Sequence, residues 1–469
     1  MSPEDRRAQI IDEARALFVE LGYGGARIHD IAVRAGITDA FIYYHFDSKR
    51  ELYHAAIREP IEVLIHDLVE ESNAMSSRHA THQEILRHFH ELMLRYMTDI
   101  GPLLGVALLS DKLDAKELYN EFVLPKFSAA IGSILAELTG WHDQEVDLEV
   151  LVEATFGVHL GIALWRLLAP GPENQRSMAR QLGTLFGGGI PLGSPPGFEV
   201  PAASAPRAKA GRRAKAKALP AAAGEQGDPG SVEAFRAKMT QMLHGPAAPA
   251  EAAAPAGPEV RRRRMSEDAR RASILRAARE VFVAAGVKEA RTKDIASTAG
   301  ITEAFMFRVF RSKDELYQEA VEGPAGAVWQ LLTVEIETVA KDPTLTGPEI
   351  LLRVNERILV ALVEVAPLLG VVLFSDIDRG KRFVEMVAST RSSPFRRIQK
   401  VISQAAGWKP PAITSEVAMK AIMGVHLGLA LDAMLREREI DIPETARCIT
   451  AMLIAGVRAD GDRETASLA

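Results

Sequence analysis

Apolar residues recur every three or four positions along most of the chain, and glycine and proline fall mostly between these runs. This spacing is typical of amphipathic helices. The first run, from Asp5 to Leu21, places Ile10, Leu17 and Phe18 on one face. Between Thr81 and Gly187 the pattern predicts helices over Gln83 to Thr98, Leu103 to Ser110, Ala115 to Leu138, Glu145 to Leu168 and Pro172 to Phe186. We therefore predict an all-α protein.

The hydrophobic pattern occurs twice, and internal repetition decides how the chain is divided. Residues Arg6 to Pro60 align without a gap on Arg270 to Pro324, and about half of the positions are identical. Two later landmarks also repeat: GPLLGVALLSD returns as APLLGVVLFSD, and GVHLGIAL returns as GVHLGLAL. Two similar halves thus flank a connecting segment. The predicted domains are residues 1–50 and 51–190 in half one, a linker over 191–264, and residues 265–314 and 315–460 in half two.

The most strongly repeated stretch, Arg27 to Tyr53, reads as two short helices joined by a tight turn. Gly36 stands where a left-handed residue ends the first helix, and Thr38 can cap the second. In the second helix Ile42 and Phe46 are four apart and should face the core. The stretch is a helix-turn-helix, so residues 1–50 and 265–314 are predicted DNA-binding domains.

The other side chains of the second helix point outward and have no packing purpose. They are Asp39, Ala40, Phe41, Tyr43, Tyr44 and His45. Base edges, thymine methyl groups and phosphates are suitable partners for such a face. Ser48 then caps a third helix whose first turn carries Lys49, so an ammonium and free backbone N–H groups converge where a phosphate can bind.

The run GITDAFIYYHFDSKREL resembles the DNA-binding signature of TetR-type transcriptional regulators. The family usually has Ser or Thr where the two copies have Arg27 and Arg291, and a guanidinium there can reach a phosphate. The resemblance implies that the DNA backbone is contacted by Thr38, Tyr43, His45 and Lys49, and that the bases are faced by Asp39, Ala40, Phe41 and Tyr44.

The second copy departs further from the family signature. It has Phe307, Arg308 and Val309 at the three positions of Tyr43, Tyr44 and His45, so its phosphate-binding phenol is missing. Arg308 offers donors that suit guanine. The candidate DNA-binding residues of this copy are Arg291, Lys293, Thr302, Glu303, Phe305, Phe307, Arg308 and Lys313.

Each half also contains two glycines four apart, in the motif GVHLG. Small residues on one helical face let two helices approach closely. By the resemblance, the last two helices of each half form a four-helix bundle, with residues 145–186 packed on residues 415–457. A hydrogen-bonded interface histidine is favoured over a ligand or metal site at this place. The candidate interface residues are Gly157, His159, Gly161, Gly424, His426 and Gly428.

The middle helices of each half carry apolar residues that are candidates for a ligand pocket, although such residues more often form a core. The resemblance favours a pocket, and the few charges nearby favour an apolar small-molecule effector. Because the two linings differ, the halves should not bind the same ligand, or only one should bind. The candidates are Phe89, Met93, Met97, Leu108 and Phe122 in half one, and Trp329, Leu362, Phe374 and Met386 in half two.

Neither a catalytic constellation nor a zinc-type spacing is recognisable, so we expect no enzyme activity, no metal and no cofactor. The net charge of −6 is an average, because the linker is basic. One cysteine, the lack of a signal peptide and the lack of an uninterrupted apolar run of membrane-spanning length indicate a soluble cytoplasmic protein.

The linker is rich in Ala, Pro and Gly and should form no core. Within it, Ser231 to Gly245 can form a docking helix with Val232, Phe235, Met239 and Met242 on one face.

Two basic stretches of the linker, Pro206 to Pro220 and Arg261 to Arg264, suit phosphates or a minor groove, with a flexible tether as the alternative. Pro60 and Pro324 predict a shared bend in the helix after each helix-turn-helix. This bend either takes part in signalling between the two domains or is only a consequence of packing.

These observations predict a sequence-specific DNA-binding regulator in which the two halves pair within one chain. The expected mechanism is repression from an imperfect palindrome, with release by an effector. Two alternatives stay open: half two is a dimerisation and effector domain without DNA binding, or the protein is mainly a ligand- or partner-binding scaffold. Further self-association is compatible with either.

Overall fold

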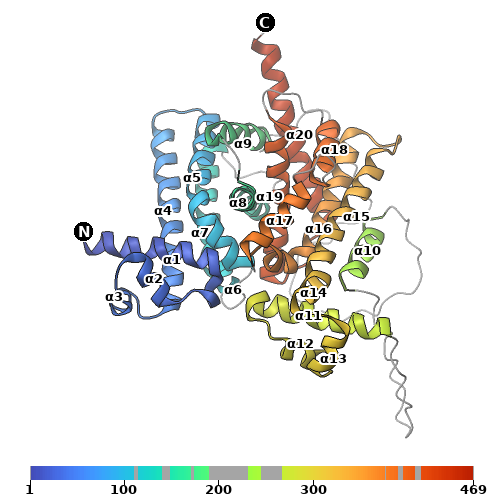
Figure 1. Ribbon diagram of the computed structural model, residues 1–469. Coiled ribbons are helices and arrows are strands. Elements are labelled where there is room, and N and C mark those ends of the chain that lie inside the picture. The colour runs from blue at the N-terminus through green and yellow to red at the C-terminus, as the bar shows by residue number, and fades with distance from the viewer. Residues whose placement is uncertain are drawn as a thin grey trace, which may run out of the picture.

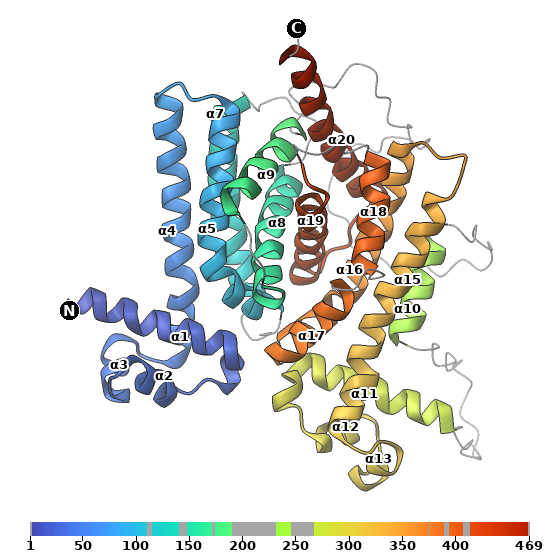
Figure 2. The same cartoon turned by 45° about the horizontal axis from the view of Figure 1, so that its top comes forward.

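A computed structural model describes residues 2–109, 115–139, 148–170, 174–189, 231–244, 267–374, 376–388, 394–406 and 413–467. Every regular element in these ranges is helical, which confirms the predicted all-α class. The two halves lie side by side, and the helix-turn-helix domains of both are found at the same end of the molecule (Figures 1 and 2). We call these domains head one and head two.

Head one consists of α1 (Pro3–Gly25), α2 (Ile28–Ala35) and α3 (Asp39–His45). Ser2 begins α1 with a capping box, because its hydroxyl accepts a hydrogen bond from the Asp5 N–H while the Asp5 carboxylate accepts one from the Ser2 N–H. Head two repeats the order with α11 (Glu267–Glu289), α12 (Thr292–Thr298) and α13 (Glu303–Val309).

The body of half one is built from long helices. It comprises α4 (Lys49–Ser77), α5 (His82–Leu109), α6 (Ala115–Glu117), the π-helical segment η1 (Leu118–Val123), α7 (Leu124–Thr139), α8 (Leu148–Leu168) and α9 (Gln175–Gly189). The two helices expected around residue 102 are one helix, α5, because Pro102 is accommodated within it.

The body of half two follows the same plan with more divisions. It comprises α14 (Lys313–Tyr317), the π-helical segment η2 (Gln318–Glu322), α15 (Gly323–Ala340), α16 (Gly347–Phe374), α17 (Ile377–Ala388), α18 (Pro394–Ala406), α19 (Ser415–Arg436) and α20 (Ile442–Ser467).

The proline shared by the two halves does not have the same effect in both. In half one α4 continues through Pro60, which lies inside the helix. In half two a π-helical segment ends just before α15, and Pro324 is the second residue of α15.

The halves meet in a bundle formed by α8 and α9 of half one and α19 and α20 of half two (Figure 1). Helices α8 and α19 cross with backbone against backbone. A Cβ atom on Gly157 would lie 2.4 Å from the Gly424 carbonyl oxygen, and one on Gly428 would lie 2.4 Å from the Glu153 carbonyl oxygen. Only glycine permits this approach.

The connecting segment contributes one described helix, α10 (Val232–His244), which lies against α15 and α16. Phe235, Met239 and Leu243 are buried, whereas the expected contact residue Met242 is exposed. The segment therefore docks on half two through the predicted face, with Leu243 in place of Met242. The remaining parts of the linker, with both basic stretches, lie outside the described residues.

Four of the described helices, α5, α8, α16 and α19, are long and apolar enough to cross a membrane by length and composition alone. In each of these helices 72 to 83% of the most apolar window is buried inside the protein. Their apolarity is accounted for by the core and the contact between the halves.

The glycine crossing generates a stability prediction. Gly157→Ala should lower the free energy of unfolding by about 1–3 kcal/mol, because the new methyl group meets backbone that cannot rotate away. Gly326→Ala is the matched control, since its Cβ would meet only the Met386 side chain at 3.5 Å in ordinary contact. Urea unfolding of both variants checks this, and equal stabilities would contradict the crossing.

Candidate nucleic-acid interface

Each head turns between its second and third helices on a left-handed glycine. Gly36 has φ +66° and Gly300 has the same value. In head one the Ile37 N–H donates to the Ala32 carbonyl at 2.9 Å, and in head two Ile301 does so to Ala296 at 2.9 Å. These hydrogen bonds supply donors to carbonyl groups at the C-terminal ends of α2 and α12, which have no partner within their own helix. The predicted role of Gly36 is confirmed.

Helix α3 separates a buried side from an exposed aromatic side. Ile42 and Phe46 are buried at 0% and 1% exposure, as predicted. Tyr44 is 80% exposed, Tyr43 52% and Phe41 40%. The ring of His45 lies 5.2 Å from both the Phe41 ring and the Tyr44 ring, centroid to centroid. The rings of α3 thus form a contiguous aromatic face directed at solvent.

Polar groups surround this face in head one. Thr38 occupies the N-cap position of α3, but its hydroxyl makes no capping bond. Asp39 lies 3.1 Å from the His29 imidazole. The Lys49 ammonium lies 4.3 Å from the centre of the Tyr23 ring, at the start of a helix that Ser48 caps. Ala40 and Arg27 are exposed.

Head two presents a different face on α13. Phe307 and Arg308 are exposed, and the Arg308 guanidinium lies 4.7 Å from the centre of the half-buried Phe305 ring. Thr302 caps α13 by accepting from the Phe305 N–H at 3.2 Å. The Glu303 carboxylate accepts a hydrogen bond from the hydroxyl of Thr292, which ties the start of α13 to the start of α12 within head two.

The remaining basic candidates of head two lie around α13. Arg291 and Lys293 are exposed. Lys313 donates to the Lys288 carbonyl at 3.3 Å, and partial burial lowers its pKa.

A cleft beside α13 brings in a residue that the sequence prediction missed. Arg270 lies 5.3 Å above Phe305, on the ring that also carries Arg308. The two arginines and Thr302 line a cleft of about 450 Å³. The repeat gave no signal for it, because its counterpart in head one, Arg6, was not a candidate either. Head two therefore replaces the aromatic face of head one by two arginines on an aromatic ring.

The two heads also touch. A Cβ atom on Gly24, at the end of α1, would lie 3.7 Å from the Glu289 side chain at the end of α11. Helices α3 and α13 lie on the outer side of these first helices at one end of the molecule (Figure 2).

Comparison with known proteins agrees with this geometry. Residues 10–56 and 274–320 each match the N-terminal domain model described as "Bacterial regulatory proteins, tetR family". The chain therefore carries two TetR-type N-terminal domains, as a tandem duplication of the subunit places them. The recognition made from the signature in the second helix is thereby confirmed.

Curated relatives of this TetR-type chain include transcription regulators. The HTH-type transcriptional activator FasR of Mycolicibacterium smegmatis is 39% identical over 62 residues, 13% of this chain and 28% of FasR. The biofilm operon icaADBC negative regulator IcaR of Staphylococcus aureus is 33% identical over 90 residues, 19% of this chain and 48% of IcaR. The chain thus spans less than half the length of either relative.

A solved structure of the fatty acid degradation regulator FadR from Bacillus halodurans also matches part of the TetR-type chain. It is 20% identical, covers 39% of this chain and 95% of its own, and has a TM-score of 0.34.

The glycines expected at the TetR-type interface lie at the crossing of α8 and α19. Beside the contacts of Gly157 and Gly428, a Cβ atom on Gly161 would lie 2.9 Å from the Gly424 Cα atom. His159 and His426 are completely buried, and each ring Nδ1 lies 2.7 Å from the carbonyl four residues earlier in its own helix.

The histidine of half one has a second partner. Its Nε2 atom lies 3.1 Å from Nδ1 of the buried His90, and the two rings are stacked. The histidine hydrogen bonds therefore join groups within each half.

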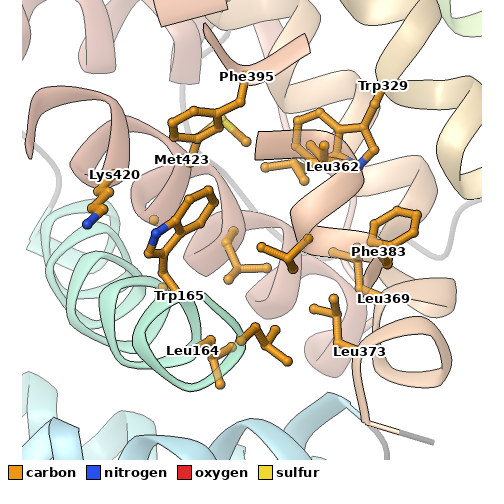
Figure 3. Close-up of a pocket in the computed structure, with 16 residues that line it drawn as sticks. Leu164, Trp165, Trp329, Leu362, Leu369, Leu373, Phe383, Phe395, Lys420 and Met423 are labelled. Atoms are coloured by element: carbon orange, nitrogen blue, oxygen red, sulfur yellow. The ribbon is translucent and has the colours of Figure 1, made fainter. Parts of the chain in front are cut away.

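The predicted pocket residues lie in three kinds of environment: at a cavity, in the packed core or at the surface. Trp329 and Leu362 line an apolar cavity of about 130 Å³ at the contact between the halves (Figure 3), whereas Phe89 lines a cavity of about 30 Å³ in half one. Met386 is 54% exposed, so it is not a pocket residue. The other candidates fill packing positions: Met93, Met97, Leu108 and Phe374 are buried in the core, and Phe122 is half-buried beside Arg58 and Lys126.

The two sides of α3 generate opposite predictions for stability. Ile42→Ala should lower the free energy of unfolding by about 2–5 kcal/mol, because it leaves a cavity in the core of head one. Tyr44→Ala should change it by less than about 0.5 kcal/mol, because the side chain faces solvent. Thermal unfolding of both variants checks the assignment, which fails if Tyr44→Ala is the more harmful change.

The buried histidines predict acid sensitivity. Burial lowers the pKa of His159 and of His426 to about 4. Because these folded values lie below the unfolded value of about 6.5, the stabilisation is complete above pH 6.5 and is lost as the pH falls towards 4. Each of the two histidines should therefore lower the free energy of unfolding by roughly 2 kcal/mol between pH 7 and pH 5.

Urea unfolding at the two pH values measures this loss. His159→Gln should reduce the pH-dependent loss relative to the unaltered protein. The same loss in both proteins would show that His159 does not contribute to it.

Proposed function

We propose that the protein is a sequence-specific DNA-binding transcription regulator in which both heads of one chain bind two unlike half-sites. The observation that carries the proposal is the exposed face on each recognition helix, at the same end of the molecule (Figure 2). Exposed rings and guanidinium groups have no packing role there and suit base edges and phosphates. The TetR-type match over both heads supports the same use.

The two heads should read different sequences. Arg308 of head two can donate two hydrogen bonds to the O6 and N7 atoms of a guanine. Head one has Tyr44 at that position, whose ring and hydroxyl suit a thymine methyl group or a phosphate. The operator is therefore an imperfect palindrome, with half-site centres roughly 34–36 Å apart in successive major grooves.

Occupation of a promoter would make the protein a repressor, released by a small apolar effector bound in the helical body. The alternative is that the protein activates transcription. The names of the relatives include both kinds of regulator, because FasR is called an activator and IcaR a negative regulator. The site of action is the cytoplasm.

A second candidate function has an observation in its favour. Head two has Phe307 where head one has the phenol of Tyr43, so a DNA backbone contact implied for head one has no equivalent there. Half two would then act as a built-in dimerisation and effector domain, and only head one would bind DNA.

Footprinting separates these candidates. The full chain is used to capture fragments of its own genome, with the region upstream of its own gene included, and bound fragments are footprinted at near-physiological salt. One protected region with two unlike half-sites is expected. Tyr43→Ala should weaken protection of one half-site and Arg308→Ala that of the other, each by about tenfold or more in affinity.

Arg396→Ala, a change of an exposed arginine on α18, is the control and should leave the footprint intact. Protection of a single half-site that is insensitive to Arg308→Ala would support the second candidate. Capture that depends on salt and not on sequence would contradict specific regulation and favour a scaffold.

A further inference from the structure

The cleft of head two is formed by the first helix, α11, the glycine turn and the recognition helix α13, and two of its arginines meet on one aromatic ring. The Arg308 guanidinium lies 4.7 Å from the centre of the Phe305 ring, and the Arg270 guanidinium lies 5.3 Å from the same centre. Stacking on a ring restricts both side chains. Head two therefore holds two positive charges in restricted positions beside its recognition helix.

The fold does not use the hydrogen-bond donors of these two arginines. Within the part of the chain that the structure describes, neither guanidinium forms a hydrogen bond or an ion pair. The neighbouring Arg271 behaves differently, because it donates to the Val309 carbonyl at 3.2 Å and pairs with Glu319 at 2.5 Å. Arg271 thus ties α11 to the rest of half two. A guanidinium that stacks on a ring keeps its N–H groups in the plane, where an external acceptor can reach them.

The repeat shows which exchange of residues opens the cleft. In head one Arg6, the counterpart of Arg270, donates to Gln9 at 2.7 Å. Gln9 in turn donates to the Ala35 carbonyl at 3.3 Å and so bridges α1 to the end of α2. In head two the position of Gln9 is taken by Ser273, whose shorter side chain lines the cleft. The exchange removes the partner of the arginine and makes room beside it.

The chemistry of the cleft suits an anion that carries several oxygens. Besides the two arginines, the hydroxyl-bearing residues Ser273 and Thr302 line it. The planar fork of a guanidinium matches the oxygens of a phosphate with two parallel hydrogen bonds. The same head has Phe307 at the position of Tyr43, to which the family resemblance assigns a contact with the DNA backbone. One phosphate contact is thus missing in the head that has the cleft.

We infer that the cleft is a phosphate site of head two, in which Arg270 binds a backbone phosphate of the second half-site while Arg308 contacts a guanine. The inference rests on the proposed function, because it takes bound DNA as the source of the phosphate. Arg270 then supplies the backbone contact that Phe307 cannot make. Backbone contacts fix the position of a protein along the duplex, so Arg270 also determines which base pair Arg308 meets. Head two is thereby a DNA-binding head and not only part of a dimerisation domain.

A methylphosphonate scan of the captured operator tests the contact on the full chain. Each phosphate of the half-site protected by head two is replaced in turn by a neutral methylphosphonate, and the affinity is measured at one salt concentration. Several positions should weaken binding of the unaltered protein, one of them through Arg270 by about tenfold. In Arg270→Ala this position alone should lose its effect, because the contact that it removes is already absent.

Two further variants serve as controls. Arg276→Ala removes an exposed arginine from the same helix. Its counterpart in head one is Asp12, a residue that a phosphate would repel, so this variant should keep every sensitive position. Arg308→Ala should keep the sensitivity that depends on Arg270 and should lose the preference for one guanine.

A scan in which Arg270→Ala keeps the sensitivity of the unaltered protein at every position would overturn the inference. A free phosphate offers the same oxygens as the DNA backbone, so the DNA-free chain is also titrated with inorganic phosphate in a calorimeter. Binding of inorganic phosphate that Arg270→Ala abolishes, together with an unchanged scan, would assign the cleft to a free anion and would also overturn the inference.

A scrambled duplex of the same length separates these results from a failure of the proposed function. Equal affinity of the unaltered protein for the operator and the scrambled duplex would contradict sequence-specific regulation. The phosphate contact stays measurable in that case. On the scrambled duplex Arg270→Ala should lower the slope of log affinity against log salt by about one, and Arg276→Ala should not. An unchanged slope in Arg270→Ala would then count against the phosphate contact itself.

Discussion

The close approach of α8 and α19 is the contact on which the rest of the structure depends. Gly157, Gly161, Gly424 and Gly428 bring two backbones together at distances that admit no Cβ atom. Because the crossing joins the penultimate helix of each half to that of the other, it fixes the two bodies relative to each other and so places both heads at one end (Figure 1). A pair of recognition helices held in this way has a defined separation, which is what two successive major grooves require.

Pairing of unlike halves is favoured by the chemistry at the ends of the crossing. At one end Arg438 donates to the buried carboxylates of Glu153 and Asp432, both at 2.5 Å, and these three residues form a buried ion cluster. If two copies of half one paired through α8, the counterparts of Asp432, Arg436 and Arg438 would be Trp165, Ala169 and Gly171. Glu153 would then be buried without the arginine that it contacts in this chain. Burial of a carboxylate without its partner costs roughly 3–5 kcal/mol. The buried ion cluster therefore selects half two as the partner of half one, and the same asymmetry leaves an apolar cavity at the other end.

Much of this could be predicted because it follows from local rules. The left-handed Gly36, the buried positions of Ile42 and Phe46, and the paired glycines are each set by spacing within one or two helical turns. The repeat then extended these predictions from one half to the other. The expected docking helix formed for the same reason, although its buried face includes Leu243 in place of Met242.

The errors concern properties that depend on what packs against a residue. Met97 and Leu108 correspond in the repeat to Leu362 and Leu373, yet only the latter pair borders the cavity, because neighbours from α8 and α19 differ. Met386 is apolar at helical spacing, but α17 turns it to solvent. Pro60 and Pro324 align, yet only half two places a π-helical segment before its proline. The hydrophobic pattern of one helix does not indicate which other helix packs against it.

The central claim is that one chain pairs its own two halves to bind DNA, and the mass of the protein–DNA complex tests it most directly. Native mass spectrometry is applied to the full chain bound to a duplex that contains one pair of footprinted half-sites. The account predicts one chain per duplex, with both half-sites protected. Two chains per duplex, each contacting DNA through head one alone, would contradict it.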